Sequence, residues 1–169
     1  AACFISPAAY ADTYPRQAGV DAVHHVFRLT FTDESDEIAG EASVSLKLAA
    51  SMKEVSLDLA SVDGAKGMTV SEVAIRGQAA RFEHASGRLR VALPGRAQDG
   101  EEVQLLVRYR GIPAAGLRLL RNIHGERTIF SENWPNRARQ WLPMIDHPYD
   151  KATGEFIVTT PAHYQVVAN

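Results

Sequence analysis

Cysteine is almost missing from this chain of 169 residues, which contains only Cys3. A single cysteine excludes an internal disulfide and any zinc cluster built from several thiolates. The chain also lacks an apolar run long enough to span a bilayer, so the sequence predicts no transmembrane segment. Because 46% of the residues are hydrophobic, the composition predicts one ordinary globular domain with a real core.

An excess of one charge sign is missing as well, because the formal net charge is −2. No global field therefore attracts the chain to nucleic acid or to a membrane, and we predict no nucleic-acid partner. Arginines do concentrate in one region, and we expect them to form salt bridges on a solvated strand face rather than a ligand patch. They are Arg108, Arg110, Arg118, Arg121, Arg127, Arg137 and Arg139.

A sustained helical repeat is missing before Asn133, and alternation of apolar and polar residues takes its place. Short alternating segments recur, separated by turn signals such as Arg76-Gly77 and Asp99-Gly100. This pattern predicts an all-β fold, an antiparallel β-sandwich over residues 12–169, with little helix beyond a brief turn near residues 135–140. In the first segment, Val23, His25, Phe27, Leu29 and Phe31 are predicted to share one face.

The first eleven residues, AACFISPAAYA, are small and apolar before the chain becomes polar at Asp12. The end of this stretch fits the small-x-small pattern that precedes a signal-peptidase cut. We interpret residues 1–11 as the remnant of an export signal, which predicts an exported protein, periplasmic or secreted. Two alternatives stay open: a lipoprotein signal that ends at Cys3 and anchors the protein there, or an arbitrary start with no signal.

The most unusual segment is Glu132–Ala152, with the sequence ENWPNRARQWLPMIDHPYDKA. Its prolines fix their own φ and push the preceding residues towards extended geometry. The segment is therefore predicted to be a stiff, irregular loop that wraps over a scaffold, and such loops often carry function. Along this path Arg139 and Asp146 are close enough to pair, while Trp134 and Trp141 can supply apolar anchorage.

Chemistry that would make the chain an enzyme by itself is not found in the sequence. None of the six histidines begins a His-Glu-x-x-His motif, which a zinc peptidase needs. The adjacent His24 and His25 point to opposite faces of a strand, so they cannot chelate one ion together. Asp146 and His147 are neighbours, but no nucleophile lies at a recognisable elbow. We predict no catalytic residue and no metal ligand in these 169 residues.

Three segments carry a family resemblance in the same order along the chain. Tyr109–Leu117, YRGIPAAGL, precedes the loop, and Phe156–Asn169 follows it as a closing strand. Together they resemble the N-terminal domain of the zinc aminopeptidase family, which includes aminopeptidase N and leukotriene hydrolase, over about residues 21–169. The matching loop residues are Arg139, Trp141, Leu142, Pro143, Asp146, Pro148, Lys151 and Ala152.

The resemblance implies a β-sandwich that packs against a catalytic domain of the same chain and is not itself catalytic. That domain would follow Asn169 and would hold the Zn²⁺, while these 169 residues alone would be inactive and would bind no cofactor. The whole enzyme would remove N-terminal residues from peptides with zinc-activated water. The sandwich would cap the active-site cleft and help to position the amino terminus of the peptide substrate.

The same resemblance implies that Glu132, Asn133 and Trp134 contact the substrate. Relatives hold the substrate ammonium group with a Glu or Gln, and this position falls on Trp134 here, which is a departure. Either Glu132 takes the role, or Trp134 contacts the ammonium group through a cation–π interaction, or the parent protein has lost or altered its activity. Simple packing of Trp134 under the catalytic domain is a further alternative.

For the rest of the loop, the resemblance implies a structural role. Arg139, Asp146 and Lys151 would hold its shape through ion pairs and hydrogen bonds to backbone carbonyls. An isolated domain should also expose the face that meets its neighbour, so we predict an apolar patch around Trp134, Trp141 and Leu142.

Two other functions stay open. The domain could be an interaction scaffold from a catalytically inactive relative, because Trp134 replaces the usual acceptor. It could instead be a free-standing carbohydrate-binding or adhesion sandwich, which predicts exposed coplanar aromatic side chains.

Overall fold

The computed structural model describes residues 17–49 and 51–168. The export remnant at residues 1–11 and Cys3 lie outside the described residues, so the inferences about them stay predictions. Strands dominate, which confirms the predicted all-β fold. The strands are β1 (Val20–Thr30), β2 (Ile38–Leu48), β3 (Glu54–Asp58), β4 (Gly67–Ile75), β5 (Gln78–Ala79), β6 (Phe82–Ala85), β7 (Arg88–Ala92), β8 (Glu102–Ile112), β9 (Leu117–Arg121), β10 (Arg127–Ser131) and β11 (Thr153–Thr159).

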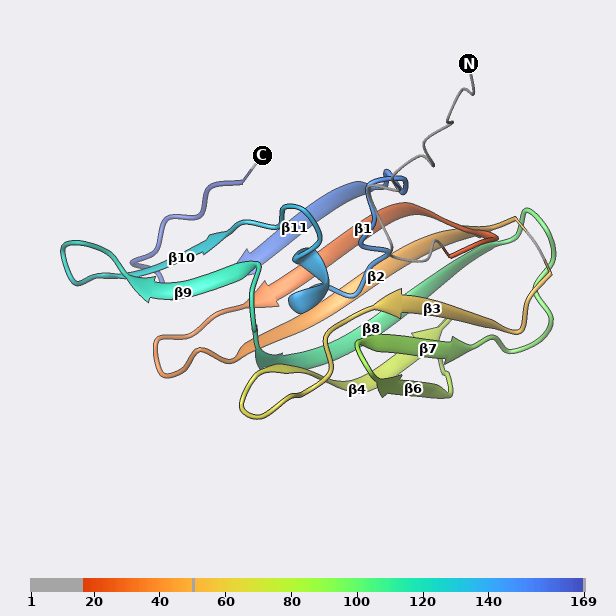
Figure 1. Ribbon diagram of the computed structural model, residues 1–169, viewed down its shortest axis with the longest axis horizontal. Coiled ribbons are helices and arrows are strands. Elements are labelled where there is room, and N and C mark those ends of the chain that lie inside the picture. Colours follow the sequence, from red (N-terminus) through yellow and green to blue (C-terminus); the bar gives the residue numbers. More distant parts are fainter. Residues whose placement is uncertain (1–16, 50, 169) are drawn as a thin grey trace, which may run out of the picture.

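Two sheets form the body of the domain. The larger has the order β11-β1-β2-β8-β4-β5, and the smaller has the order β3-β7-β6. In Figure 1 the smaller sheet lies across one face of the larger one, over β8 and β4. Neighbouring strands are antiparallel except β1 and β11, which run parallel. The sequence does not predict this exception, because β11 returns to β1 only after the long loop.

The core lies between the two sheets and follows the predicted alternation. Ala42, Val44, Leu46 and Leu48 of β2 are fully buried, and they belong to the same cluster as Val55, Leu57, Leu89 and Val91 of the smaller sheet. Burying each of these valine and leucine side chains is worth roughly 1.5–3 kcal/mol. The binary pattern of the sequence therefore places both sheets face to face.

One predicted core position is wrong, and its cause is local. A β-bulge between Ala22 and His24 shifts the register of β1 against β2. The extra residue turns Val23 outward, where its side chain is exposed, while Ala22 and His25 are buried on either side of the shift. A bulge adds one residue to the alternation, so a strict period of two fails at this point.

The outer face of the large sheet carries a row of charged side chains. Arg108 on β8 donates to Glu41 on β2 and to Glu72 on β4, both at 2.9 Å. Arg28 on β1 lies 3.9 Å from the same Glu41. Of the seven arginines expected to form salt bridges on a strand face, Arg108 does so here. Exposed pairs of this kind contribute little stability, typically about 0.2–1 kcal/mol each.

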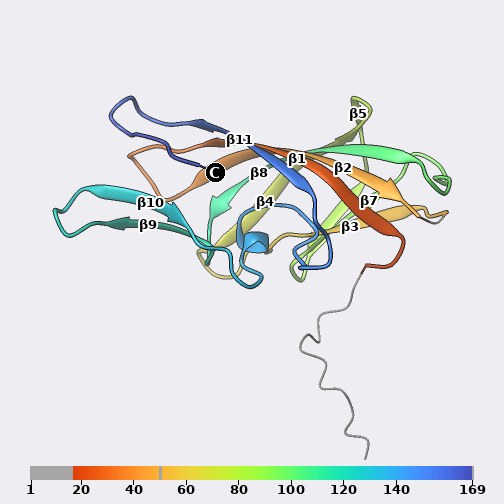
Figure 2. The ribbon, with the colours of Figure 1, turned by 90° about the horizontal axis from the view of Figure 1, so that it is seen from above.

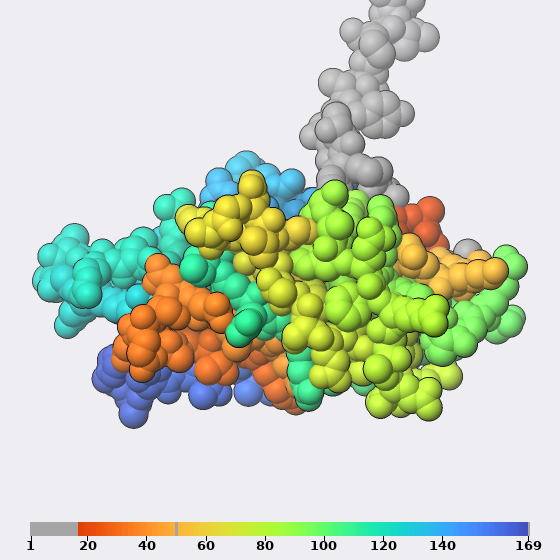
Figure 3. Space-filling view, turned by 90° about the horizontal axis from the view of Figure 1, so that it is seen from below, coloured from red at the N-terminus to blue at the C-terminus, as the bar shows by residue number. Residues whose placement is uncertain are grey.

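Strands β9 and β10 form a separate hairpin, which we call the arm. Figure 3 shows the arm projecting beyond the rest of the molecule. Next to its turn the arm is held by Arg127, the first residue of β10, which pairs with Asp36 at 2.9 Å and donates to the Ser35 carbonyl at 2.6 Å. The acidic turn after β1 therefore anchors the arm, whereas its tip is exposed at Ile123.

Helix is confined to one short turn in the described part of the chain. The 3-10 helix η1 covers Ala138–Gln140, within the segment where the sequence predicts a brief helical turn. Figure 2 shows it beneath the large sheet, where the long loop crosses the body. None of the described segments forms a helix with the length and hydrophobicity needed to cross a bilayer.

Candidate functional site

The loop that follows β10 begins with a tightly bonded turn at Glu132–Arg137. The N–H of Glu132 donates to the carbonyl of Gly116 at 2.8 Å, and the N–H of Arg137 donates to the carbonyl of Asn133 at 2.8 Å. Gly116 has φ +79°, and a Cβ at this position would lie 2.3 Å from the Arg137 carbonyl oxygen. Only glycine allows this close approach of the arm base to the turn.

Both carboxylate oxygens of Glu132 are already bonded within the turn. Oε1 accepts a hydrogen bond from the N–H of Trp134 at 3.0 Å, and Oε2 pairs with the guanidinium of Arg137. The side chain is nevertheless partly exposed. Glu132 therefore acts here as a cap that shapes the turn, and its negative charge is neutralised by Arg137.

Asn133 and Trp134 have opposite environments although they are adjacent. The Asn133 Oδ1 accepts a hydrogen bond from the indole Nε1 of Trp141 at 3.0 Å. The Trp134 side chain, in contrast, is 80% exposed. A fixed turn that presents a bare indole is chemically unusual, because a large aromatic side chain normally loses water contact when a protein folds.

The predicted apolar patch around Trp134, Trp141 and Leu142 is wrong for two of its three members. Trp141 and Leu142 are only 3% and 2% exposed. Trp141 packs near Phe156, with ring centroids 6.4 Å apart. Its polar Nε1 is satisfied by Asn133, so the whole side chain can be buried at little cost. Trp141 thus anchors the loop, and Trp134 alone remains at the surface.

The middle of the loop is fixed by a chain of charged groups. Arg139 donates to Asp146 Oδ2 through its backbone N–H and its Nε, both at 3.1 Å, and to the Asp146 carbonyl at 2.6 Å. The N–H of Asp146 then donates to Asp58 Oδ2 at 3.0 Å. Asp58 Oδ1 lies 2.9 Å from Arg88 of β7. The pair that the sequence suggested is therefore present, and it is linked to the smaller sheet.

Asp58 is the residue of this network that sequence reasoning missed. Its position between Leu57 and Leu59 in an alternating strand predicts an exposed side chain, but only 1% of Asp58 is exposed. Its backbone also bonds reciprocally to Met144 of the loop, at 2.7 and 3.2 Å. An aspartate within a β-strand is unusual, and this was the one available signal.

The remaining predicted loop residues are less integrated. Lys151 is exposed, and within residues 17–49 and 51–168 no ion pair of Lys151 is found. His147 lies beside Tyr149, with ring centroids 4.6 Å apart, and its Nδ1 accepts from the Tyr149 N–H at 3.2 Å. The structure brings Asp146 together with Arg139 rather than with His147.

An apolar groove lies beside the loop and takes the place of the predicted patch. It has a volume of about 400 Å³, and it runs between the arm and the edge of the large sheet. Most of the large exposed hydrophobic side chains gather at this end of the domain: Leu120, Ile123, Phe130, Trp134, Phe156, Ile157, Val166 and Val167. Apolar clusters of this kind mark contact surfaces.

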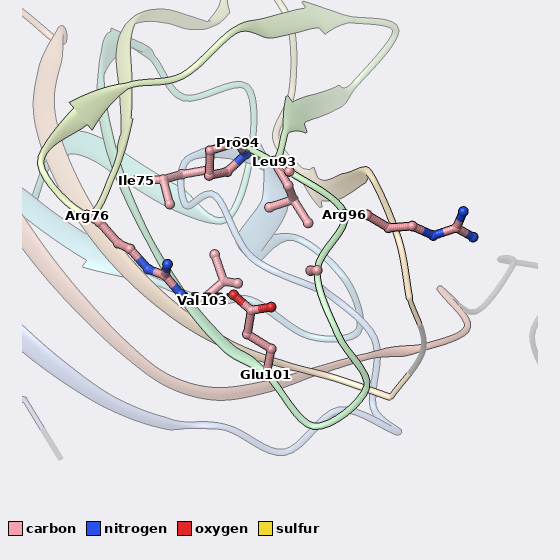
Figure 4. Close-up of a pocket in the computed structure, with 9 residues that line it drawn as sticks. Ile75, Arg76, Leu93, Pro94, Arg96, Glu101 and Val103 are labelled. Atoms are coloured by element: carbon pink, nitrogen blue, oxygen red, sulfur yellow. Dashed lines mark hydrogen bonds and ion pairs between the residues drawn. The ribbon is translucent and has the colours of Figure 1, made fainter.

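A second cavity, of about 300 Å³, lies at the opposite end, between the β4–β5 turn and residues 93–103. Figure 4 shows Arg76 reaching towards Glu101, which it meets at 2.9 Å, while Arg96 points away. Because the ion pair at the mouth is internally neutral and the floor is apolar, this cavity offers no group for acid–base or metal chemistry.

Zinc is the metal that the resemblance implies for the parent protein. Among the described residues, no group of three His, Cys, Asp or Glu side chains could hold a metal ion. Buried His25 has one neighbouring histidine, but its Nε2 has no polar partner within the described chain. The side chains of the described residues do not fit a zinc site, so no reaction step can be assigned to them.

Comparison with known proteins identifies the domain. The sequence profile of the peptidase M1 N-terminal domain matches residues 21–169. The chain belongs to this family. Among curated protein sequences, none matches the chain significantly.

Solved structures agree with the family assignment. An M1 zinc metallopeptidase from Deinococcus radiodurans is similar at 27% identity and TM-score 0.72, over 85% of this chain and 33% of that protein. A mutant of the Deinococcus radiodurans enzyme bound to a Tyr-Ser-Ala substrate is similar at 28% identity and TM-score 0.71, with coverage of 85% and 33%. Yeast LTA4 hydrolase shares the fold, at 23% identity and TM-score 0.71, over 85% of this chain and 23% of that one. The chain thus spans about a third of the length of the Deinococcus enzyme.

Proposed function

We propose that this chain is the N-terminal domain of a zinc-dependent aminopeptidase, in which it caps the active-site cleft and helps to position the amino terminus of a peptide. Membership of the M1 family and the zinc metallopeptidases among its relatives support a peptidase parent. The catalytic domain of the same longer chain, with its Zn²⁺, is the partner in this proposal. The chemistry belongs to that domain, and the sandwich supplies shape and contacts.

The observation that carries the proposal is the exposed indole of Trp134 on a turn whose other polar groups are already bonded. The side chain of Asn133 is used by Trp141, and both oxygens of Glu132 are used within the turn. A preorganised loop loses little conformational entropy when it meets a ligand or a partner. Trp134 is therefore the side chain with which this turn can make a new contact.

The bonding of the turn also bears on the alternatives for the substrate ammonium group. To accept from an ammonium group, Glu132 would have to share or give up its pairing with Arg137. The Trp134 ring needs no such exchange, and a cation over an indole face gains about 0.5–2 kcal/mol, depending on desolvation. We therefore assign the substrate contact first to Trp134, with Glu132 and Asn133 as the residues that position it.

The test is steady-state kinetics of the longer enzyme with aminoacyl substrates. Replacing Trp134→Leu should raise KM about threefold to tenfold, because the cation–π contact is lost, and Trp134→Phe should retain part of the effect. Glu132→Gln is the matched control for a direct charge contact, because it keeps the cap geometry. If Glu132→Gln raises KM more than Trp134→Leu does, the assignment to Trp134 is wrong.

An inactive interaction scaffold remains the second candidate, because Trp134 occupies the position at which the family resemblance implies Glu or Gln. An intact His-Glu-x-x-His motif in the longer chain, together with chelator-sensitive release of N-terminal residues, excludes it. These 169 residues alone should show no turnover of chromogenic aminoacyl substrates with added zinc. Turnover by the domain alone would contradict the proposed division of labour.

A further inference from the structure

The cavity between the β4–β5 turn and residues 93–103 is a feature that the proposed function does not use. Its lining includes the buried apolar side chains of Ile75, Ala97 and Val103. A neighbouring hollow of about 270 Å³ is also lined by Ile75, and it reaches the exposed strand β5. Volumes near 300 Å³ lie at the lower end of the range for small-molecule sites. The two hollows therefore offer space for a small apolar group.

One wall of this cavity is fixed by backbone hydrogen bonds, although it belongs to no strand. The N–H of Leu93 donates to the carbonyl of Lys53 at 2.8 Å, and the N–H of Ala97 donates to the carbonyl of Met52 at 3.0 Å. Both bonds hold the connection between β7 and β8 against the segment before β3. A cavity with a fixed wall loses little conformational entropy when a ligand enters it.

Arg76, at the mouth of the cavity, has an unusual backbone conformation. Its φ is +52°, and Gly77 follows with φ +76° in the turn between β4 and β5. A bulky residue rarely adopts a positive φ, because glycine and asparagine do so at lower cost. The turn between β6 and β7 has the same φ of +52° at Ser86, where the side chain is small. Strained residues concentrate at ligand sites, so the arginine at this position points to a role for its side chain.

The guanidinium of Arg76 has donors to spare. Its Nη2 donates to Glu101 Oε1 at 2.9 Å, and the Arg76 side chain is 67% exposed. The other oxygen, Oε2 of Glu101, accepts from the N–H of Gln98 at 2.9 Å. A guanidinium carries five N–H donors in a fork that matches a carboxylate. Arg76 can therefore hold a second carboxylate while its pair with Glu101 stays intact.

The charges around the two hollows favour an anion. Their described lining residues include the cations Arg76, Arg81 and Arg96 and a single carboxylate, that of Glu101. Arg96 points away from the cavity in Figure 4, and its Nε donates to Ser51 Oγ at 2.8 Å. It thus adds positive potential but no direct contact. A local excess of positive charge raises the concentration of anions at the mouth, although the net charge of the chain is −2.

We propose that this cavity binds a small apolar carboxylate, whose tail packs against Ile75, Leu93 and Val103 and whose carboxylate group binds Arg76 beside Glu101. Two sources share this chemistry, a short fatty acid and the C-terminal residue of a peptide, because both carry one carboxylate next to an apolar group. The cavity lies within the sandwich, so binding there requires no step of the proposed peptidase reaction.

The test is a titration of the longer enzyme with octanoate and with N-acetylleucine, measured by saturation-transfer NMR. At least one acid should bind with a dissociation constant of about 1 mM or below, and the acid that binds more tightly identifies the source. Octanamide and N-acetylleucinamide are the matched neutral controls. They should bind at least about tenfold more weakly, because the charge-assisted hydrogen bonds to Arg76 are lost. Absence of binding by both acids, or equal binding of acids and amides, overturns the proposal.

Variants locate the binding and separate it from folding. Asparagine tolerates a positive φ, so Arg76→Asn should leave the melting temperature unchanged or raise it, while the affinity for the acid falls at least about tenfold. Ser86→Asn is the matched control, because it makes the same change of residue at the other turn and should leave the affinity unchanged. Glu101→Gln should strengthen binding about twofold to tenfold, because a like charge beside the ligand is removed.

Two results with these variants contradict the assignment to Arg76. One is an affinity that Arg76→Asn leaves as unchanged as Ser86→Asn does, which places the acid elsewhere in the enzyme. The other is a loss of affinity in Glu101→Gln as large as that in Arg76→Asn, which means that the ion pair itself, rather than the free donors of Arg76, maintains the cavity. Peptidase activity is measured separately, so a failure of the proposed function is distinguishable from a failure of this site.

Discussion

The two halves of the long loop are built on opposite principles. The rear half, Arg139–Asp146, is bonded to the smaller sheet through Asp58, which is almost completely buried. The front half, Glu132–Arg137, bonds mainly to itself and to the arm base at Gly116, and it presents Trp134 to solvent. The rear half therefore contributes to the stability of the domain, whereas the front half can change without unfolding it.

This difference explains how an irregular loop can hold a side chain in place for a partner. A functional group on a loop is precise only when its supporting residues are locked by packing and hydrogen bonds. Here the locking groups are charged and buried, and the presented group is apolar and exposed. The distribution is the reverse of the ordinary rule for folded proteins, which argues that both departures serve a purpose.

The largest expected loss of stability comes from breaking the bonds between the rear half of the loop and the smaller sheet. Asp58→Ala removes the partner of Arg88 and the acceptor for the Asp146 N–H, and breaking a buried pair costs about 3–5 kcal/mol. Urea denaturation of the chain measures this loss. Glu41→Ala is the matched control, because Glu41 also pairs with arginine but lies on the outer face, and it should lose less than about 1 kcal/mol. Equal losses would contradict the assigned role of Asp58.

The second effect is a pH dependence of the free energy of unfolding, which arises from His25 in β1. Burial, followed by the neighbouring His24, lowers the pKa of His25 from 6.5 to about 4, against a hydrogen bond with the Thr153 backbone that raises it. The unfolded chain thus binds the extra proton first as the pH falls, so this group makes the domain less stable from about pH 6.5 down to about 4. The full loss is about 3 kcal/mol.

Denaturation at pH 7 and at pH 4 measures this dependence. His25→Leu should flatten the part of the pH profile that His25 contributes. His124→Leu is the control, because His124 is an exposed residue in the turn of the arm and is not among the groups that shift the pKa of His25. If the profile of His25→Leu keeps the full slope of the unmodified chain, the assignment to His25 is wrong.

A smaller loss of stability is expected from a substitution at Gly116, where the front half of the loop contacts the base of the arm. Gly116→Ala places a Cβ 2.3 Å from the Arg137 carbonyl oxygen at φ +79°, and we expect a loss of about 2 kcal/mol from strain and displacement of the turn. Gly125→Ala, in the arm turn, has φ +82° but open space around the new Cβ, so it should lose only about 1 kcal/mol. Similar losses would show that the contact with Arg137 is unimportant.

Much of the fold could be predicted from local patterns. The alternation in β2, β3, β7 and β8 predicts the two sheets, because each apolar side chain needs a face to bury against. The bulge at Val23 and the parallel pairing of β11 with β1 could not be predicted, since both depend on which strand lies alongside. Alternation within one strand carries no information about its neighbour.

The site was predicted less completely. The spacing of Arg139 and Asp146 is short, so their pairing could be read from the loop sequence. Asp58 lies 88 positions from Asp146, and no local pattern connects them. The burial of Trp141 also depends on a distant contact with Phe156, whereas the exposure of Trp134 follows from the turn that Glu132 caps.

The smallest expected effect on stability belongs to Trp134 and gives the sharpest contrast with Trp141. Trp134→Ala removes a side chain that is already in water, so the free energy of unfolding should change by less than about 0.5 kcal/mol. Trp141→Ala leaves a cavity under the loop and should cost about 3–5 kcal/mol. Thermal or urea denaturation of the 169-residue chain measures both. In the longer enzyme, Trp134→Ala should alter substrate kinetics or domain contact although the domain stays folded, because the role we propose for Trp134 lies outside these residues. A large loss of stability from Trp134→Ala in the short chain would mean that the indole belongs to the core, and both halves of the loop would then be structural.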